Sequence, residues 1–137
     1  MVAALHGAVL GGGLELALAA HLRVADETAF YALPEGRLGI YLGGGGSVRI
    51  GRVIGPDRVR EMMLTGRRLD AEEGGRLGLH HYTVGEGEAL SRALELASTT
   101  SENAPLTNRL ILSVPSRVDD VSREHGLFLE ALTTALT

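Results

Sequence analysis

The amino-acid sequence predicts a mixed α/β fold in which strands and helices alternate first and helices follow alone. Apolar runs that are typical of buried strands occur at Val2–Leu5 and Thr28–Leu33, on either side of an apolar helical stretch. Beyond Gly66 apolar residues recur every three or four positions, which is the spacing of amphipathic helices. We therefore expect an α/β core over residues 1–66 and a helical region over residues 67–137.

The first part of the chain contains the strand signals. Gly7 ends the first strand, and Leu14–Leu22 is apolar almost all round, which predicts a fully buried helix. Short strands at Leu22–Val24 and Thr28–Leu33 follow, and Pro34 ends the second of them. The glycine-rich stretch Gly36–Gly46 is typical of a loop, and we expect a helix from about Ser47 to Ile54.

The second part of the chain carries helix boundary signals. Pro56 suits a first helical turn, and Gly66 suits the end of that helix. Asp70 and Glu73 have the spacing of a capping box, with Gly78 as the expected stop. The remaining expected elements are a short strand at His80–Val84, an amphipathic helix at Leu90–Ala97, a helix between Pro105 and Pro115, and a last helix at Val121–Leu136.

Composition excludes several functional classes. The chain has 137 residues and a net charge of −4, and all 13 of its basic residues are arginine, so no basic patch for nucleic acid is indicated. It contains no cysteine, which rules out disulfides and thiolate metal sites. Met1–Leu5 lacks the basic start of a signal peptide, and the longest apolar run, Leu14–Ala20, is too short to span a bilayer. We expect a soluble, cytoplasmic protein without membrane contact.

The 19 glycines do not form a nucleotide-binding motif. A phosphate-binding P-loop requires a lysine, and neither glycine cluster has the G-x-G-x-x-G spacing. The residues around Ser47 do not match the nucleophile elbow G-x-S-x-G. His80 and His81 are adjacent and would point to opposite faces of a strand, so we expect no metal site.

Glu15 is the most unusual residue because it lies within an apolar helical run. Its neighbours one turn away are Gly11, Leu18 and Ala19, so no cation on the same helix neutralises it. Burial of a charged carboxylate is costly, although the positive end of the helix dipole favours an anion in the first turn. Two interpretations stay open: a group that transfers protons, or a structural carboxylate paired with a distant arginine.

Glu35 follows Pro34 where a strand ends, and by itself it is typical of a solvated turn. It gains interest beside Glu15 and the glycines. Gly11–Gly13 would place bare backbone N–H groups at a helix start, and Gly43–Gly46 would place a second set before the next helix. Two carboxylates and two such ends suit a site that handles water beside a polarised carbonyl, and unrelated glycine-rich turns are the alternative.

The ordered motifs resemble those of the crotonase (enoyl-CoA hydratase/isomerase) superfamily. They are His6-Gly-Ala-Val-Leu-Gly-Gly-Gly-Leu-Glu-Leu-Ala17, Pro34-Glu35, Leu38-Gly39, Gly43–Gly46, Leu64-Thr-Gly66, Asp70-Ala-Glu-Glu73 and Leu77-Gly-Leu79. The resemblance covers nearly the whole chain and implies the C-terminal half of the family's fold, a partial spiral of ββα turns with a helical C-terminal region that oligomerises. Residues 1–66 would then be a remnant of the crotonase core.

The resemblance also implies roles for individual residues. Gly12 would donate one of two N–H groups to the thioester carbonyl of an acyl-CoA, with Gly11 beside it. Glu15 would hold and deprotonate the attacking water, and Glu35 would deliver a proton to the α-carbon. Gly43 would begin the helix that helps to polarise the thioester. Family isomerases usually keep the carboxylate that matches Glu35 alone, so the pair indicates hydration of a 2-enoyl-CoA, with coenzyme A as part of the substrate and no other cofactor.

Some positions depart from the family pattern. Members are about twice this length, and the missing N-terminal half supplies the second N–H donor and most contacts to coenzyme A. Leu42 replaces the usual proline, and Gly74 and Gly75 stand in a helix where alanine is commoner. The last helix would be the remnant of the family's trimer contacts, and the tail after it is short.

Two functional hypotheses follow from this resemblance. The chain is either a hydratase module that is incomplete by itself and acts with its missing half or another copy, or a truncated, inactive crotonase that serves as an oligomeric or ligand-binding protein.

Overall fold

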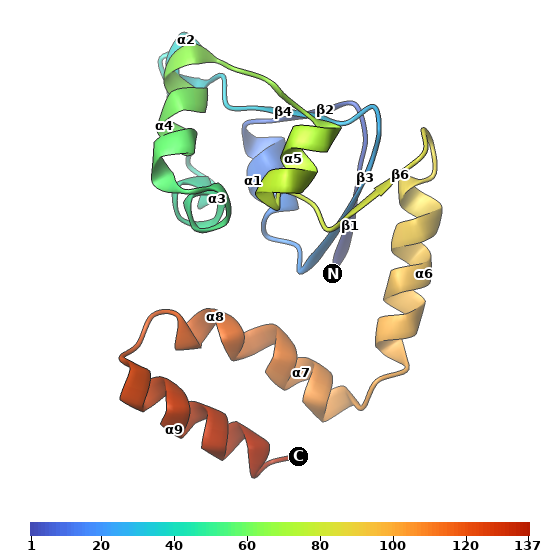
Figure 1. Ribbon diagram of the computed structural model, residues 1–137, viewed down its shortest axis with the longest axis vertical. Coiled ribbons are helices and arrows are strands. Elements are labelled where there is room, and N and C mark those ends of the chain that lie inside the picture. The colour runs from blue at the N-terminus through green and yellow to red at the C-terminus, as the bar shows by residue number, and fades with distance from the viewer. The chain divides into compact units, whose positions relative to one another are not determined.

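The computed structural model describes all residues 1–137 and divides them into two compact units, Met1–Leu96 and Ala97–Thr137. The first unit contains six strands and the helices that pack on them (Figure 1). The boundary falls within helix α6 (Ala89–Ser101). The α/β fold class predicted from the sequence is confirmed.

The first unit contains two three-stranded sheets. Sheet A has the order β1 (Val2–Leu5), β3 (Leu22–Asp26), β6 (Tyr82–Val84), and all of its strands are parallel. Sheet B has the order β2 (Ala8–Leu10), β4 (Phe30–Ala32), β5 (Leu69–Asp70), and β4 pairs parallel with β2 and antiparallel with β5. Strands β1 and β2 are edge strands, with one hydrogen-bonding side not used by this chain.

The chain passes from one sheet to the other twice and adds a helix each time. Strands β1 and β2 lead into α1 (Gly12–Ala17), and β3 and β4 lead into α2 (Glu35–Leu38). Gly7 lies between β1 and β2 with φ +54°, a conformation that glycine adopts without a steric penalty. These two ββα turns are the partial spiral expected from the sequence.

Helix α1 differs from the expected buried helix at Leu14–Leu22. It ends at Ala17, and the side chain of Leu16 is 69% exposed. The expected range overlapped the start of β3 at Leu22, and the chain needs a turn before that strand can pair with β1. The short helix therefore buries one face only, which includes Leu14, Glu15 and Ala17.

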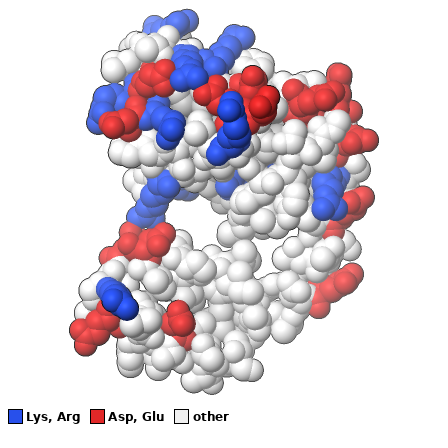
Figure 2. Space-filling view, in the orientation of Figure 1, with Lys and Arg blue, Asp and Glu red and all other residues white.

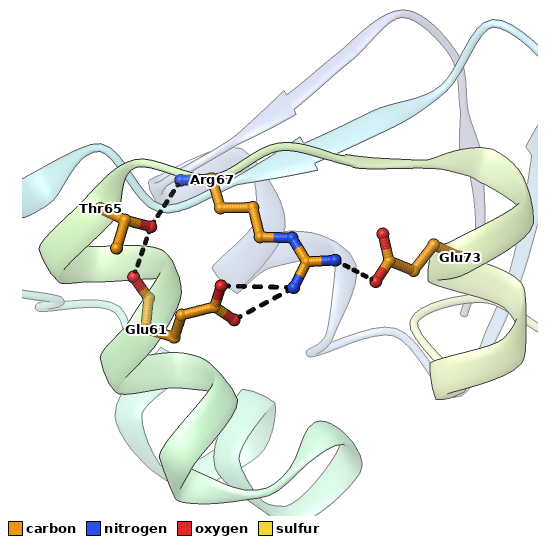
Figure 3. A network of polar contacts seen from close by, with 4 residues as sticks. All are labelled: Glu61, Thr65, Arg67 and Glu73. Atoms are coloured by element: carbon orange, nitrogen blue, oxygen red, sulfur yellow. Dashed lines mark hydrogen bonds and ion pairs between the residues drawn. The ribbon is translucent and has the colours of Figure 1, made fainter.

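Helices α3 (Gly46–Ile54) and α4 (Pro56–Thr65) pack against each other and against the preceding elements. Figure 3 shows how Arg67, which follows α4, links that helix to α5 (Ala71–Leu77). Its guanidinium donates to Glu61 of α4 at 3.2 Å and to Glu73 of α5 at 2.6 Å. These groups are partly exposed, so the network contributes modestly to stability.

The expected N-cap at Asp70 is confirmed: its Oδ1 accepts from the backbone N–H of Glu73 at 2.8 Å at the start of α5, while the Glu73 carboxylate binds Arg67, so only this half of the capping box forms. Gly78 ends that helix in the left-handed conformation, with φ +86°. The compact unit continues to Leu96, beyond the core end expected at Gly66, because β5 and β6 pair with strands of the first part. The role of residues 67–137 in oligomerisation stays a prediction.

A chain of polar contacts that begins at two buried side chains and ends at the exposed Thr83 lies beside α5. The hydroxyl of Tyr31 is 2.7 Å from Nδ1 of His80, and Nε2 of His80 is 2.8 Å from the hydroxyl of Thr83. Burial raises the pKa of Tyr31 and lowers the pKa of His80, so both side chains are neutral near pH 7. Gly74 and Gly75 of α5 lie directly against these rings. Their close approach explains why glycine stands at these two helical positions.

The second unit consists of helices α7 (Pro105–Ser113), α8 (Pro115–Val118) and α9 (Arg123–Thr134), joined to the end of α6. Of residues 97–137 only Gly126 is buried. Charged side chains cover the visible face of the first unit densely, whereas the C-terminal helices present mainly uncharged atoms (Figure 2). None of the helices combines the length and apolar character needed to cross a bilayer.

Replacing Gly74 by alanine tests the packing of α5. A Cβ atom there would lie 2.3 Å from Cε2 of Tyr31, so Gly74→Ala should lower the free energy of unfolding by about 1–3 kcal/mol despite the helix propensity of alanine. Gly51 lies inside α3 with no atom near its Cβ position, so Gly51→Ala should raise that free energy by up to about 1 kcal/mol. Urea denaturation measures both, and equal effects of the two substitutions would contradict the packing.

Candidate active site

Glu15 is buried, with 7% of its surface exposed, although no cation pairs with it. Its carboxylate leaves the first turn of α1 and points to the loop before α3. Oε1 accepts hydrogen bonds from the backbone N–H groups of Gly44 and Gly46, both at 2.8 Å. Such bonds to a carboxylate are short and strong, and they offset the cost of its burial. The N–H groups of this loop thus stabilise the buried carboxylate, a role for which the sequence analysis considered a distant arginine.

The loop can approach Glu15 only because it lacks side chains. A Cβ atom at Gly46 would lie 2.6 Å from Cγ of Glu15, and one at Gly44 would lie 3.1 Å from its carboxyl carbon. A larger residue at Gly46 would push the loop away and break both bonds. The glycine-rich stretch therefore serves to bring two N–H donors against one carboxylate.

Glu35 is also buried, with 5% of its surface exposed, and it is the first residue of α2 rather than a solvated turn residue. Oε1 of Glu35 lies against the backbone of Gly11, where a Cβ atom would be 2.7 Å away. Oε2 is buried and has no hydrogen-bond partner. An unpaired buried carboxyl oxygen is costly, and such groups concentrate at sites that serve a ligand.

Gly11 lies between the two glutamates. Its N–H donates to the carbonyl of Ala32 in β4 at 3.0 Å, and its own carbonyl accepts from the N–H of Glu15 at 3.0 Å. Its φ of +46° turns the chain into α1, which begins at Gly12. Gly11 therefore links the start of α1, which carries Glu15, to β4, which leads to Glu35.

Helix α3 begins later than the family resemblance implies. The resemblance places its start at Gly43, but it begins at Gly46, because Gly45 adopts the left-handed conformation with φ +88° and serves as its N-cap. Gly43 is exposed and precedes the helix. Four surface grooves of the chain are lined by neither Glu15 nor Glu35, and the convergence of the two side chains on one cavity stays a prediction.

Sequence reasoning did not single out Gly44, Gly46 and Arg49, which hold or flank the carboxylate of Glu15. The run of four glycines was the available signal, but it did not show which N–H groups turn inward. His80 and His81 do not share a ligand position. His80 bonds Tyr31 and Thr83, whereas Nδ1 of His81 accepts from the N–H of Arg23 at 3.1 Å.

The chain as a whole is similar to known proteins. The family model described as enoyl-CoA hydratase/isomerase matches residues 1–123. The chain belongs to this family, within the crotonase superfamily. The family resemblance seen in the ordered sequence motifs is thereby confirmed.

Curated family members and solved structures agree with this assignment. The chain is 38% identical over 131 residues to "Probable enoyl-CoA hydratase 2, mitochondrial" of Arabidopsis thaliana, which covers 96% of the chain and 44% of the relative. It is 39% identical over 126 residues to a carnitinyl-CoA dehydratase of Salmonella paratyphi A, which covers 92% and 48%.

Among solved structures, a candidate enoyl-CoA hydratase from Rhodopseudomonas palustris matches with TM-score 0.95 and 50% identity, over 98% of the chain and 52% of that protein. An enoyl-CoA hydratase from Bacillus anthracis matches with TM-score 0.90 and 36% identity, over 98% and 52%. The chain thus spans about half the length of the family members it matches.

The carboxyl group of Glu15 accepts two hydrogen bonds and Oε2 of Glu35 accepts none, and this difference predicts how substitution of each residue changes the free energy of unfolding. Glu15→Gln exchanges two charge-assisted hydrogen bonds for weaker neutral ones, so it should lower the free energy of unfolding by about 1 kcal/mol. Glu35→Gln removes no hydrogen bond at Oε2, so that free energy should change by less than about 0.5 kcal/mol. Urea denaturation at pH 7 measures both, and a larger loss for Glu35→Gln would contradict the assigned contacts.

Proposed function

We propose that this chain carries the paired glutamates of an enoyl-CoA hydratase site, which adds water to a 2-enoyl-CoA thioester. The observations that support this most are the two buried carboxyl groups, one held by loop N–H groups and the other lying against Gly11 at the start of the helix that carries the first. Membership of the enoyl-CoA hydratase/isomerase family agrees with it.

In this proposal Glu15 is the base. Both loop donors bind Oε1, which leaves Oε2 to accept a proton from the attacking water. The water oxygen bonds to the β-carbon, and the electrons of the double bond move toward the thioester oxygen. The N–H of Gly12 at the start of α1 donates to that oxygen as its negative charge develops.

Glu35 is the acid. In its protonated form it delivers the proton from Oε2 to the α-carbon, which completes the addition of water, and the proton that Glu15 took from water then passes to Glu35 and restores the starting state. In this scheme Gly11, which lies against the carboxyl group of Glu35, binds the substrate. Gly43, which is exposed at the beginning of the glycine loop before α3, also contacts the substrate. No cofactor beyond the coenzyme A of the substrate takes part in this scheme.

We further propose that the chain corresponds to the C-terminal half of the family's fold and that its site is completed by the other half. The share of the relatives that it covers and the unused edges of β1 and β2 agree with this. A missing second N–H donor would lower the rate by about 10²–10³-fold. A cytoplasmic location stays a prediction.

Substitution of the glutamates tests the chemistry. The chain, supplied with the N-terminal half of a family member as a separate polypeptide, should hydrate crotonyl-CoA, measured by the loss of absorbance of the conjugated thioester. Glu15→Gln and Glu35→Gln should each reduce this rate about 10²–10⁴-fold. Glu72→Gln, an exposed change on α5, is the matched control.

The same variants separate hydration from double-bond migration. Isomerase activity should fall less in Glu15→Gln than in Glu35→Gln, because only Glu15 is assigned to water. Full hydration by either variant would show that the carboxylates are structural. A complemented wild-type chain that binds the thioester without turnover would favour the inactive, ligand-binding alternative.

Self-association is a separate prediction. Helix α9 exposes Phe128 and Leu132, the turn after it exposes Leu136, and burial of each large side chain contributes about 1.5–3 kcal/mol. We expect light scattering at tens of micromolar to give a mass well above the 14.4 kDa of one chain. Phe128→Glu should lower that mass, whereas a monomeric wild-type chain would contradict the prediction.

A further inference from the structure

The loop that holds Glu15 consists of glycines, so its own sequence does not restrain it. Gly43–Gly46 has no side chain that packs, and glycine loses more conformational freedom on ordering than any other residue. Yet two of its N–H groups must point at the same oxygen, Oε1 of Glu15. Some group outside the loop must limit its conformations.

Arg49 lies on the other side of this loop. It belongs to the first turns of α3, and its guanidinium turns back so that Nη2 donates to the carbonyl of Gly44. That carbonyl stands in the chain between the two N–H groups that bind Glu15. A Cβ atom at Gly45 would lie 2.7 Å from Nη1 of Arg49, so the side chain follows the loop closely.

Apart from the bond to Gly44, the guanidinium of Arg49 has little polar support. Its Nε is buried and has no partner, which costs free energy. No carboxylate forms an ion pair with its guanidinium. The hydrogen bond of Arg49 to the carbonyl of Gly44 therefore restrains the loop, while the unpaired Nε of the same side chain costs free energy of folding.

We propose that Arg49 is a positioning residue for Glu15. It holds the carbonyl of Gly44 from outside, so that the N–H groups of Gly44 and Gly46 stay aimed at Oε1 and Oε2 stays directed to the substrate water. The contacts to the loop stand by themselves, whereas the consequence for water activation rests on the proposed hydratase function.

Hydrogen exchange tests the structural part without any activity. In the full 137-residue chain, the amides of Gly44 and Gly46 should exchange about tenfold faster in Arg49→Met than in wild type, followed by ¹⁵N NMR. Arg49→Lys, which can still donate to the carbonyl, should restore part of the protection. The urea midpoint should not fall in Arg49→Met, because the substitution removes the unpaired Nε and the carbonyl of Gly44 that loses its donor is exposed to water.

Arg76→Met is the matched control, since Arg76 is an exposed arginine on α5. It should leave exchange at Gly44 and Gly46 as in wild type, whereas Glu15→Gln should speed it. Unchanged protection in Arg49→Met, or a loss of protection spread over the whole first unit, would overturn the positioning role.

The rate assay tests the catalytic part. In the complemented chain, Arg49→Met should lower kcat for crotonyl-CoA about tenfold and leave KM unchanged, with partial recovery in Arg49→Lys. A normal kcat together with faster exchange would overturn the link to Glu15. Absence of hydration in the wild type would instead refute the proposed function, and the exchange result would still decide whether Arg49 holds the loop.

Discussion

The burial of the Glu15 carboxylate against two backbone N–H groups is the constraint on which the first unit depends. A carboxylate inside an apolar interior requires strong donors, and here Gly44 and Gly46 supply them. Their approach excludes side chains at both positions and fixes where α3 begins. Helix α3 packs on α1 at this contact, where the side chain of Glu15 on α1 binds the N–H groups at the start of α3.

The second glutamate depends on the same region through the backbone. Gly11 donates to Ala32 of β4, and three residues later the chain reaches Glu35. The carboxyl group of Glu35 then returns to the backbone of Gly11. Gly11 therefore contacts both residues, Glu15 through the backbone and Glu35 through its carboxyl group. Acid–base chemistry on a single substrate requires two groups held close together, and this is what we propose for the two glutamates.

The two units differ sharply in how well they bury apolar surface. Residues 1–96 form a packed core with a satisfied polar chain at Tyr31, His80 and Thr83. Residues 97–137 bury a single glycine and leave most of their large apolar side chains in contact with solvent. Helices gain most of their stability in proteins from packing an apolar face. The apolar faces of the second unit are thus available to further protein surface, whereas the first unit has a buried core of its own beneath the apolar side chains that it also exposes.

The sequence by itself determined the fold class, the capping of α5 by Asp70, the start of α7 at Pro105 and the identity of the unusual carboxylate, because these follow from local spacing and residue chemistry. Ordered motifs determined the family. Local pattern overextended α1, because the pairing of Leu22 with Val2 ends the helix and is a long-range contact. It also left Glu35 as a turn residue and could not choose among the glycines of the loop. Only the tertiary structure brought Gly44, Gly46 and Arg49 to Glu15, since hydrogen bonds between residues about thirty positions apart leave no periodic trace in the sequence.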